Sequence, residues 1–274
     1  QHYSGRRSAA ELLARLRAAA ASHVGAHTEQ AMADVVLASD NFDSYATGSA
    51  INGASGGTGW ATGWVDAGTT NGLVASDAAM SGNALRITGN ADAAATRNLA
   101  SAVSGNVIIS FDFQFDAGSI SNNDFLGLWF GNSTGPNIGL KANCGTGSCT
   151  NDLFVRTSGS DAGGNVQNIA VGSTYTLMGY LQKTGTSSVY NRFDFWLNPT
   201  AHEIATLTGA DVFDTGASSI GSFSQIGFRT ATLGTADALL VDNLRISRVP
   251  EPGTLALLGL ALAGMAVSVR RRQH

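Results

Sequence analysis

The chain has 274 residues, of which 43% are hydrophobic and 13% charged, so it holds enough apolar material for a core and global disorder is excluded. Its formal net charge of −4 argues against nucleic acid as a partner, because such proteins carry a clustered basic surface. Between residues 40 and 250 the only glutamate is Glu203 and the only lysines are Lys141 and Lys183. This scarcity of helix formers, beside 34 glycines in the chain, favours strands joined by turns.

Residues 1–36 predict a leader outside the folded domain, either helical or disordered. Residues 8–21 read as a short basic helix, in which Glu11, Arg15 and Arg17 interrupt the apolar run that an export signal requires. Residues 31–33 have the small side chains of a cleavage site, but no apolar segment precedes them. Two explanations stay open: the start is truncated or misread, or the export signal is degenerate.

Residues 38–248 predict a single all-β domain, because alternation of apolar and polar residues recurs along them. The clearest strand is 107–116, with Ile109, Phe111, Phe113 and Phe115 on one face and Ser110, Asp112, Gln114 and Asp116 on the other. Further strands are predicted at 125–132, 153–158, 174–183, 191–198, 224–230 and 238–247. Strands with one wet face are typical of an antiparallel β-sandwich or jelly roll.

Three stretches of this domain, residues 40–64, 83–89 and 95–115, resemble a bacterial concanavalin A-like, or laminin-G-like, jelly-roll domain. The closing stretches 224–230 and 238–247 suit the final strands of that family. The resemblance implies the fold alone, because this fold hosts lectins, glycosidases, lyases and adhesive modules.

The domain is predicted to be non-enzymatic, with no catalytic residues. Glycosidases need two facing carboxyl groups, and glucanases that this domain resembles usually carry them as a Glu-x-Asp-x-x-Glu run, which is absent. One face of a predicted strand carries Asp112, Gln114 and Asp116. Polar residues are expected on the solvent-facing side of any such strand, so this pattern does not indicate catalysis. His202, the only histidine of the domain, falls in a predicted turn beside Glu203, which indicates a surface residue rather than a catalytic base.

Cys144 and Cys149 are predicted to form a structural disulfide outside the cytoplasm, with two free thiols as the alternative. Calcium is the one metal considered, because hard oxygen ligands suit it. Asp40 and Asp43 on the first strand are candidate ligands together with Asp242 on the last strand. The alternative is that these residues only form turns.

The four tryptophans, Trp60, Trp64, Trp129 and Trp196, are candidate platforms for a sugar ring. Trp129 alternates with Leu128 and Phe130, which predicts a ring on the opposite face from those apolar neighbours. Trp196 alternates in the same way with its neighbours, so both rings are candidates for exposure. The alternative is that the tryptophans belong to the core, as they commonly do in a sandwich.

Residues 249–274 predict a C-terminal hydrophobic helix, because 254–269 contain no charge. As a helix this stretch would be about 24 Å long, close to the apolar thickness of a bilayer, about 30 Å. The arginines behind it would stay on the cytoplasmic side and leave the domain outside. A plain membrane anchor and a buried core helix are the alternatives.

The tail closely resembles the PEP-CTERM sorting signal of Gram-negative bacteria. The residues that carry the resemblance are Pro250, Glu251, Pro252, Arg270, Arg271 and Arg272. It implies transient anchoring in the inner membrane, removal of the tail by an exosortase-type membrane protease, and display at the cell surface or in the extracellular matrix. The sequence therefore predicts an exported β-sandwich that binds extracellular polysaccharide or is purely structural, with a polysaccharide hydrolase or lyase of the same fold as the alternative.

Overall fold

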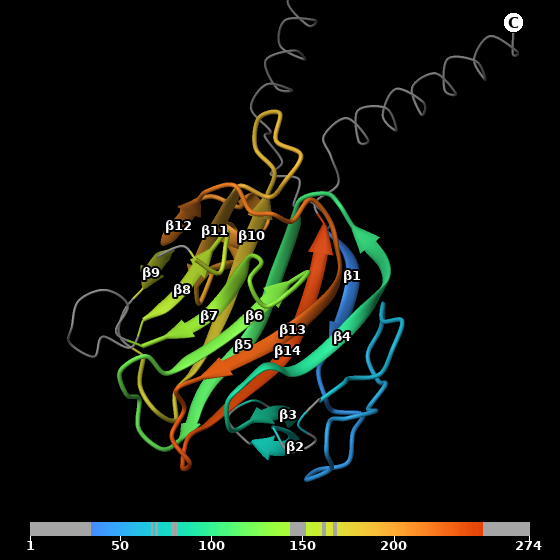
Figure 1. Cartoon of the computed structure of the whole chain (residues 1–274), viewed down its shortest axis with the longest axis vertical. Helices are drawn as coiled ribbons and strands as arrows, with labels where there is room; N and C mark the ends of the chain where they lie inside the picture. The colour runs from blue at the N-terminus through green and yellow to red at the C-terminus, as the bar shows by residue number, and fades with distance from the viewer. Residues whose placement is uncertain are drawn as a thin grey trace, which may run out of the picture. The chain divides into compact units, whose positions relative to one another are not determined.

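The computed structural model describes residues 34–66, 68, 71–77, 80, 82–142, 152–160, 163–166 and 169–248. Within these ranges the chain forms two antiparallel β-sheets that pack face to face (Figure 1). The predicted antiparallel β-sandwich is therefore confirmed, and all seven strands that were predicted from alternation are present.

The first sheet has eight strands in the order β12-β11-β10-β5-β14-β3-β2, with β1 also paired to β14. Its strands are β1 (Val35–Asp40), β2 (Gly72–Asp77), β3 (Gly82–Ile87), β5 (Val107–Ala117), β10 (Thr174–Gln182), β11 (Arg192–Leu197), β12 (Val212–Thr215) and β14 (Ala238–Arg248). The last strand, β14, pairs with β5 along one edge and with β3 and then β1 along the other. It therefore joins the beginning of the domain to its middle, and Figure 1 shows β1 beside it.

The second sheet has six strands in the order β4-β13-β6-β7-β8-β9. They are β4 (Ala91–Val103), β6 (Phe125–Phe130), β7 (Asn137–Lys141), β8 (Leu153–Arg156), β9 (Gly164–Val166) and β13 (Phe223–Ala231). All six residues of β6 and all four of β8 are buried. In a two-layer sandwich only one face of a strand packs on the other sheet, so side chains also cover the outer face of these two strands.

A short helix, α2 (Ala201–Thr206), follows β11 where the sequence predicted only a turn around His202. Thr200 and Glu203 form a capping box, in which each side chain bonds the backbone N–H of the other residue. Leu207 ends the helix in the left-handed conformation, with φ of 53°. The turn prediction is wrong because this local exchange of hydrogen bonds stabilises one helical turn without an apolar periodicity.

The core lies between the two sheets and is rich in phenylalanine. Phe111, Phe113 and Phe115 of β5 all point into it, which confirms the alternation predicted for that strand. The ring of Phe111 meets Phe228 of the opposite sheet edge to face, with ring centroids 6.4 Å apart. The polar residues of β5 face away from the core, but Gln114 and Ile108 on that face are buried, so the face is less exposed to solvent than the sequence predicted.

The described part of the domain starts earlier than predicted. Val35 and Val36 pair with Arg248 and Ser247 in β1 and β14, so the strand includes the last two residues of the predicted leader 1–36. Most of that leader lies outside the described residues, as do Cys144, Cys149 and the predicted tail 249–274 with its sorting signal. Among the helices that the structure describes, none has the length and apolar character needed to cross a membrane.

Candidate functional site

The tryptophans are structural residues rather than exposed platforms. Trp64, Trp129 and Trp196 are buried, and Trp60 is half-buried. Trp196 packs with Ile108 and Met178, and its Nε1–H donates to the backbone carbonyl of Thr208 at 2.9 Å. The prediction of exposed rings for Trp129 and Trp196 is wrong because each ring, although on the outer face of its sheet, is covered there.

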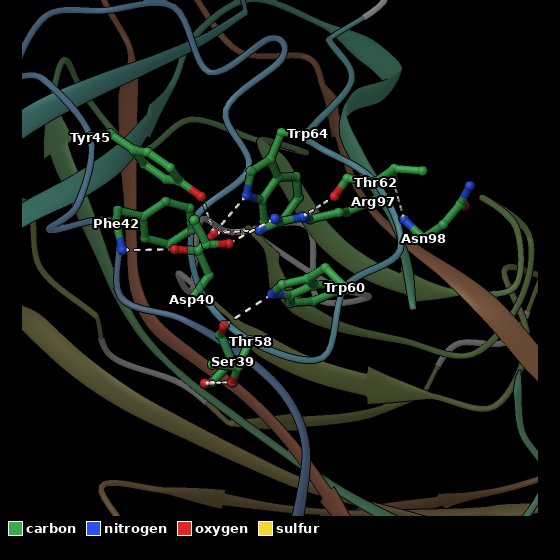
Figure 2. Close-up of polar contacts among 11 residues, drawn as sticks. Ser39, Asp40, Phe42, Tyr45, Thr58, Trp60, Thr62, Trp64, Arg97 and Asn98 are labelled. Atoms are coloured by element: carbon green, nitrogen blue, oxygen red, sulfur yellow. Dashed lines mark hydrogen bonds and ion pairs between the residues drawn. The ribbon is translucent and has the colours of Figure 1, made fainter. Parts of the chain in front are cut away.

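Asp40 lies at the centre of a buried polar cluster, drawn in Figure 2. Its Oδ2 accepts hydrogen bonds from Tyr45 Oη (2.6 Å), Trp64 Nε1 (2.8 Å) and Arg97 Nη1 (2.6 Å). Its Oδ1 accepts one from the backbone N–H of Phe42 (3.0 Å). Burial, followed by the hydrogen bond to Asp40, raises the pKa of Tyr45 to about 12, so the phenol stays protonated as a donor.

Arg97 is the partner that neutralises Asp40, and only 1% of each side chain is exposed. The rest of its guanidinium donates to the backbone carbonyls of Thr62 (2.8 Å) and Gly56 (2.7 Å). The group also lies 4.7 Å from the ring centroid of Trp60. Arg97 of β4 thus ties the loop 41–66 and the first strand of one sheet to the other sheet, and the cluster serves stability.

The predicted calcium site at Asp40, Asp43 and Asp242 is not supported. Asp40 is already neutralised by Arg97, and Asp43 accepts a hydrogen bond from the backbone N–H of Asn83 at 2.9 Å. Across the described ranges, no group of three or more His, Cys, Asp or Glu side chains has an arrangement that could hold a metal ion.

Asp242 and Asp112 stand side by side on paired strands β14 and β5. Burial raises the pKa of Asp242 to about 7, and the negative charges of Asp43, Asp112 and Asp40 add to the rise. Asp112 accepts hydrogen bonds from Thr176 Oγ1 (2.6 Å) and from Asn243 Nδ2 (2.8 Å). Asp242 is only 3% exposed, so its carboxyl group has little contact with solvent.

The outer face of the six-stranded sheet carries aromatic and cationic side chains together. Phe125 on β6 and Phe154 on β8 have ring centroids 5.5 Å apart. The guanidinium of Arg156 lies 5.3 Å from the Phe125 centroid and 5.0 Å from that of Phe154. The guanidinium of Arg229 on β13 lies 5.4 Å from Phe125. We call this group the Phe125 face, and it consists of Asp92, Phe125, Trp129, Asn137, Lys141, Phe154, Arg156 and Arg229.

Polar contacts hold the charged groups of this face in place. Arg156 Nε donates to Asn137 Oδ1 at 2.9 Å. Arg229 Nε lies 2.7 Å from Asp92 Oδ1, and Trp129 Nε1 donates to the backbone carbonyl of Asp92 at 3.2 Å. Arg156 and Asn137 are buried, so Arg229, whose side chain is 35% exposed, is the donor that a hydroxyl or carboxylate oxygen could reach, and the candidate binding face is centred on it.

Two glycines make room for the rings of the Phe125 face. A Cβ on Gly227 would lie 2.3 Å from Trp129 Cζ2, and one on Gly127 would lie 2.8 Å from Phe125 Cζ. Each ring therefore occupies the space above a glycine of the sheet. The sequence analysis missed this face, although a glycine between aromatic residues in 125–130 was a usable signal.

Replacing Gly227 by alanine is expected to lower the free energy of unfolding by about 1–3 kcal/mol, because the new methyl group collides with the Trp129 ring. Urea unfolding measures the change. Gly105→Ala is the matched control, because no atom lies within 4 Å of its added Cβ, and it should change stability by less than about 0.5 kcal/mol. Equal effects at the two positions would show that Trp129 does not lie over Gly227.

Comparison with known proteins identifies the tail. The model of the PEP-CTERM protein-sorting motif matches residues 248–272, so the predicted sorting signal is confirmed. This motif marks an exported protein that is processed by exosortase, a membrane protease. No curated protein matches the chain.

Solved structures resemble the domain at low sequence identity. Alginate lyase Aly36B is 16% identical, with a TM-score of 0.49, and the match covers 78% of this chain and 98% of that one. A glycosyl hydrolase family 16 protein from Mycobacterium smegmatis is 15% identical, with a TM-score of 0.47 and coverage of 77% and 100%. A β-1,3-glucanase from Mycobacterium marinum is 15% identical, with a TM-score of 0.46 and coverage of 78% and 99%. The chain thus joins an antiparallel two-sheet β-sandwich to a C-terminal PEP-CTERM sorting motif.

Proposed function

We propose that this exported sandwich is a non-enzymatic protein of the cell surface or extracellular matrix that binds polysaccharide through the Phe125 face. The observation that carries the proposal is the half-exposed guanidinium of Arg229, which lies 5.4 Å from the Phe125 ring centroid on an outer sheet face that also carries the half-exposed Lys141. Sugars present many oxygen acceptors, and a planar guanidinium with several N–H donors binds them well. The sorting motif supports a site of action outside the cell, where such polymers occur.

A polysaccharide hydrolase or lyase of the same fold is the alternative. The paired carboxyl groups of Asp112 and Asp242 are the feature that favours it, since one has a raised pKa and the other accepts two hydrogen bonds. The burial of Asp242 argues against it, because a general acid must touch the bond that it protonates. The remaining alternative is a purely structural β-sandwich that binds no ligand.

The test is binding of the purified protein to immobilised neutral and acidic polysaccharides. We expect Arg229→Ala to weaken binding about tenfold or more, because a charge-assisted hydrogen bond is lost. Arg192→Ala is the matched control: this arginine also pairs with an aspartate, Asp194 at 2.8 Å, and lies 4.5 Å from a Phe213 ring, but on the other sheet. It should leave binding unchanged.

The same samples distinguish the alternatives. Prolonged incubation with each polymer, followed by assays for new reducing ends and for unsaturated uronate products, should show no turnover. Product formation that Asp112→Asn abolishes would establish the enzyme instead. If the protein binds none of the polymers in the panel, a purely structural role is the remaining function.

A further inference from the structure

A group of side chains similar to the Phe125 face, an arginine with an aspartate and a phenylalanine, lies on the other sheet. Comparing the two groups shows which arginine a ligand could bind. Arg192 and Arg229 each pair with an aspartate and lie over a phenylalanine ring. Arg192 contacts Asp194 twice, through Nε at 2.9 Å and Nη2 at 2.8 Å, and the Asp194 side chain is 10% exposed. Arg192 is therefore held by two contacts to a buried carboxylate that a ligand could not displace cheaply.

The pair on the Phe125 face is different. Arg229 Nε lies 2.7 Å from Asp92 Oδ1, but the geometry is not that of a hydrogen bond, and this buried Nε has no other hydrogen-bond partner. The Asp92 side chain is 76% exposed and that of Arg229 is 35% exposed. An exposed ion pair of this kind is weak, because water and salt compete with it. Displacing Asp92 therefore costs little.

The surroundings keep Arg229 ready for an anion. The residue opposite Arg229 on β6 is Gly127, and the space above this glycine is occupied by the Phe125 ring, on which the guanidinium lies. Lys141 stands opposite Phe125 on β7 and adds a second, half-exposed cation. Asp152, next to β8, is only 1% exposed, so Asp92 is the one well-exposed carboxylate in the described part of this face.

From these observations, and resting on the proposed function, we propose that the Phe125 face takes a uronate polymer, with Arg229 binding a sugar carboxylate in place of Asp92. A carboxylate has two oxygens that match the parallel N–H groups of a guanidinium, whereas a neutral sugar hydroxyl offers one. The phenylalanine beneath restricts the guanidinium plane and so reduces the entropy lost on binding. Asp92 acts as an internal competitor that occupies the arginine in the free protein.

The experiment compares polygalacturonate with its carboxyl-reduced, neutral form at several salt concentrations. The protein should bind polygalacturonate at least about tenfold more tightly, and the preference should shrink as salt rises. Arg229→Ala should abolish the preference, and Arg229→Lys should retain only part of it, because lysine keeps the charge but not the planar pair of donors. Asp92→Asn should strengthen binding to polygalacturonate by a few fold, since it removes the competitor. Arg192→Ala should behave like the original protein.

The outcomes separate the two proposals. Equal binding of the charged and reduced polymers, or a preference that survives in Arg229→Ala, overturns the uronate assignment while polysaccharide binding stands. Weaker binding by Asp92→Asn overturns the role of Asp92 as competitor. If the protein binds neither polymer while circular dichroism shows an intact fold, the uronate assignment is overturned. If it also binds none of the immobilised polysaccharides, the proposed function is overturned as well.

Discussion

Arg97→Ala is expected to lower the free energy of unfolding by about 3–5 kcal/mol, the largest effect of any single substitution considered for this protein. The variant leaves the carboxylate of Asp40, whose side chain is 1% exposed, without a counter-charge. It also removes the donors that bind the carbonyl oxygens of Gly56 and Thr62, both in the loop before β2. Urea unfolding followed by tryptophan fluorescence measures the loss, since Trp60 and Trp64 border the site.

Two further variants make this prediction specific to the buried pair. Arg245→Ala removes an arginine whose side chain is 41% exposed and whose partner, Asp34, is 35% exposed, and should cost less than about 1 kcal/mol. The double variant Asp40→Asn, Arg97→Met should be less destabilised than the sum of its single variants by about 1–3 kcal/mol, because no unpaired charge remains buried. Additive effects within about 0.5 kcal/mol would show that the two charges do not stabilise each other.

The second large effect is a loss of stability as the pH rises through 7, caused by Asp242. Burial, with added repulsion from Asp43, Asp112 and Asp40, raises the pKa of this carboxyl group from 3.8 to about 7. Between about pH 4 and 7 the folded protein keeps a proton that the unfolded chain has released, so unfolding releases a proton and the free energy of unfolding falls as the pH rises. Well above pH 7 the carboxyl group of Asp242 is ionised in both the folded and the unfolded state. It then no longer makes the free energy of unfolding depend on pH.

Asp242→Asn should remove this part of the pH dependence, because an amide replaces the protonated carboxyl group without a charge to bury. At pH 8 the variant is expected to be more stable than the original protein by about 1–4 kcal/mol, the upper value being the full rise in pKa at about 1.4 kcal/mol per unit. Urea unfolding at pH 5, 6, 7 and 8 gives both curves. The raised pKa of Asp124 contributes with the same sign but is common to both proteins, so it cancels in their difference.

Asp116→Asn is the matched control for charge. It removes an aspartate from the same strand, β5, but one whose side chain is 31% exposed and lies 3.8 Å from Arg86. Its slope between pH 5 and 7 should equal that of the original protein. If Asp242→Asn keeps the full slope as well, the proton is held elsewhere and the explanation is wrong.

The strands that were predictable from the sequence are of two kinds: strands with alternating side chains, such as β5, and short apolar runs bounded by turn residues, such as β6 and β8. In β5 the alternation of phenylalanine with polar residues follows directly from the pleat, so its two faces were assigned correctly. Alternation did not reveal β4 (Ala91–Val103), which contains six alanines and has little apolar contrast along its length. This strand is held by its neighbours, for example by Arg97 in register with Ile226 of β13, and such pairing is invisible in a local window.

The candidate site could be predicted only in part, because its decisive contacts join distant segments. Asp40 was chosen as a calcium ligand since nothing near it in sequence shows that Arg97, 57 residues later, neutralises it. The all-apolar stretch 125–130 indicates a strand buried on both faces but does not say what covers the outer one. The arginines over Phe125 come from β8 and β13, so only the folded sheet brings them together.

The position of β14 also links the two ends of the domain. Strands β3 and β5 have other partners, β2 and β10, but β1 pairs with no described strand except β14, residues 238–248. That partner is followed at once by the motif at 248–272, which exosortase recognises. The strand that completes the first sheet and the sorting motif are therefore adjacent in the chain, so a truncation that removes the whole motif also removes Arg248, the partner of Val35 in β1.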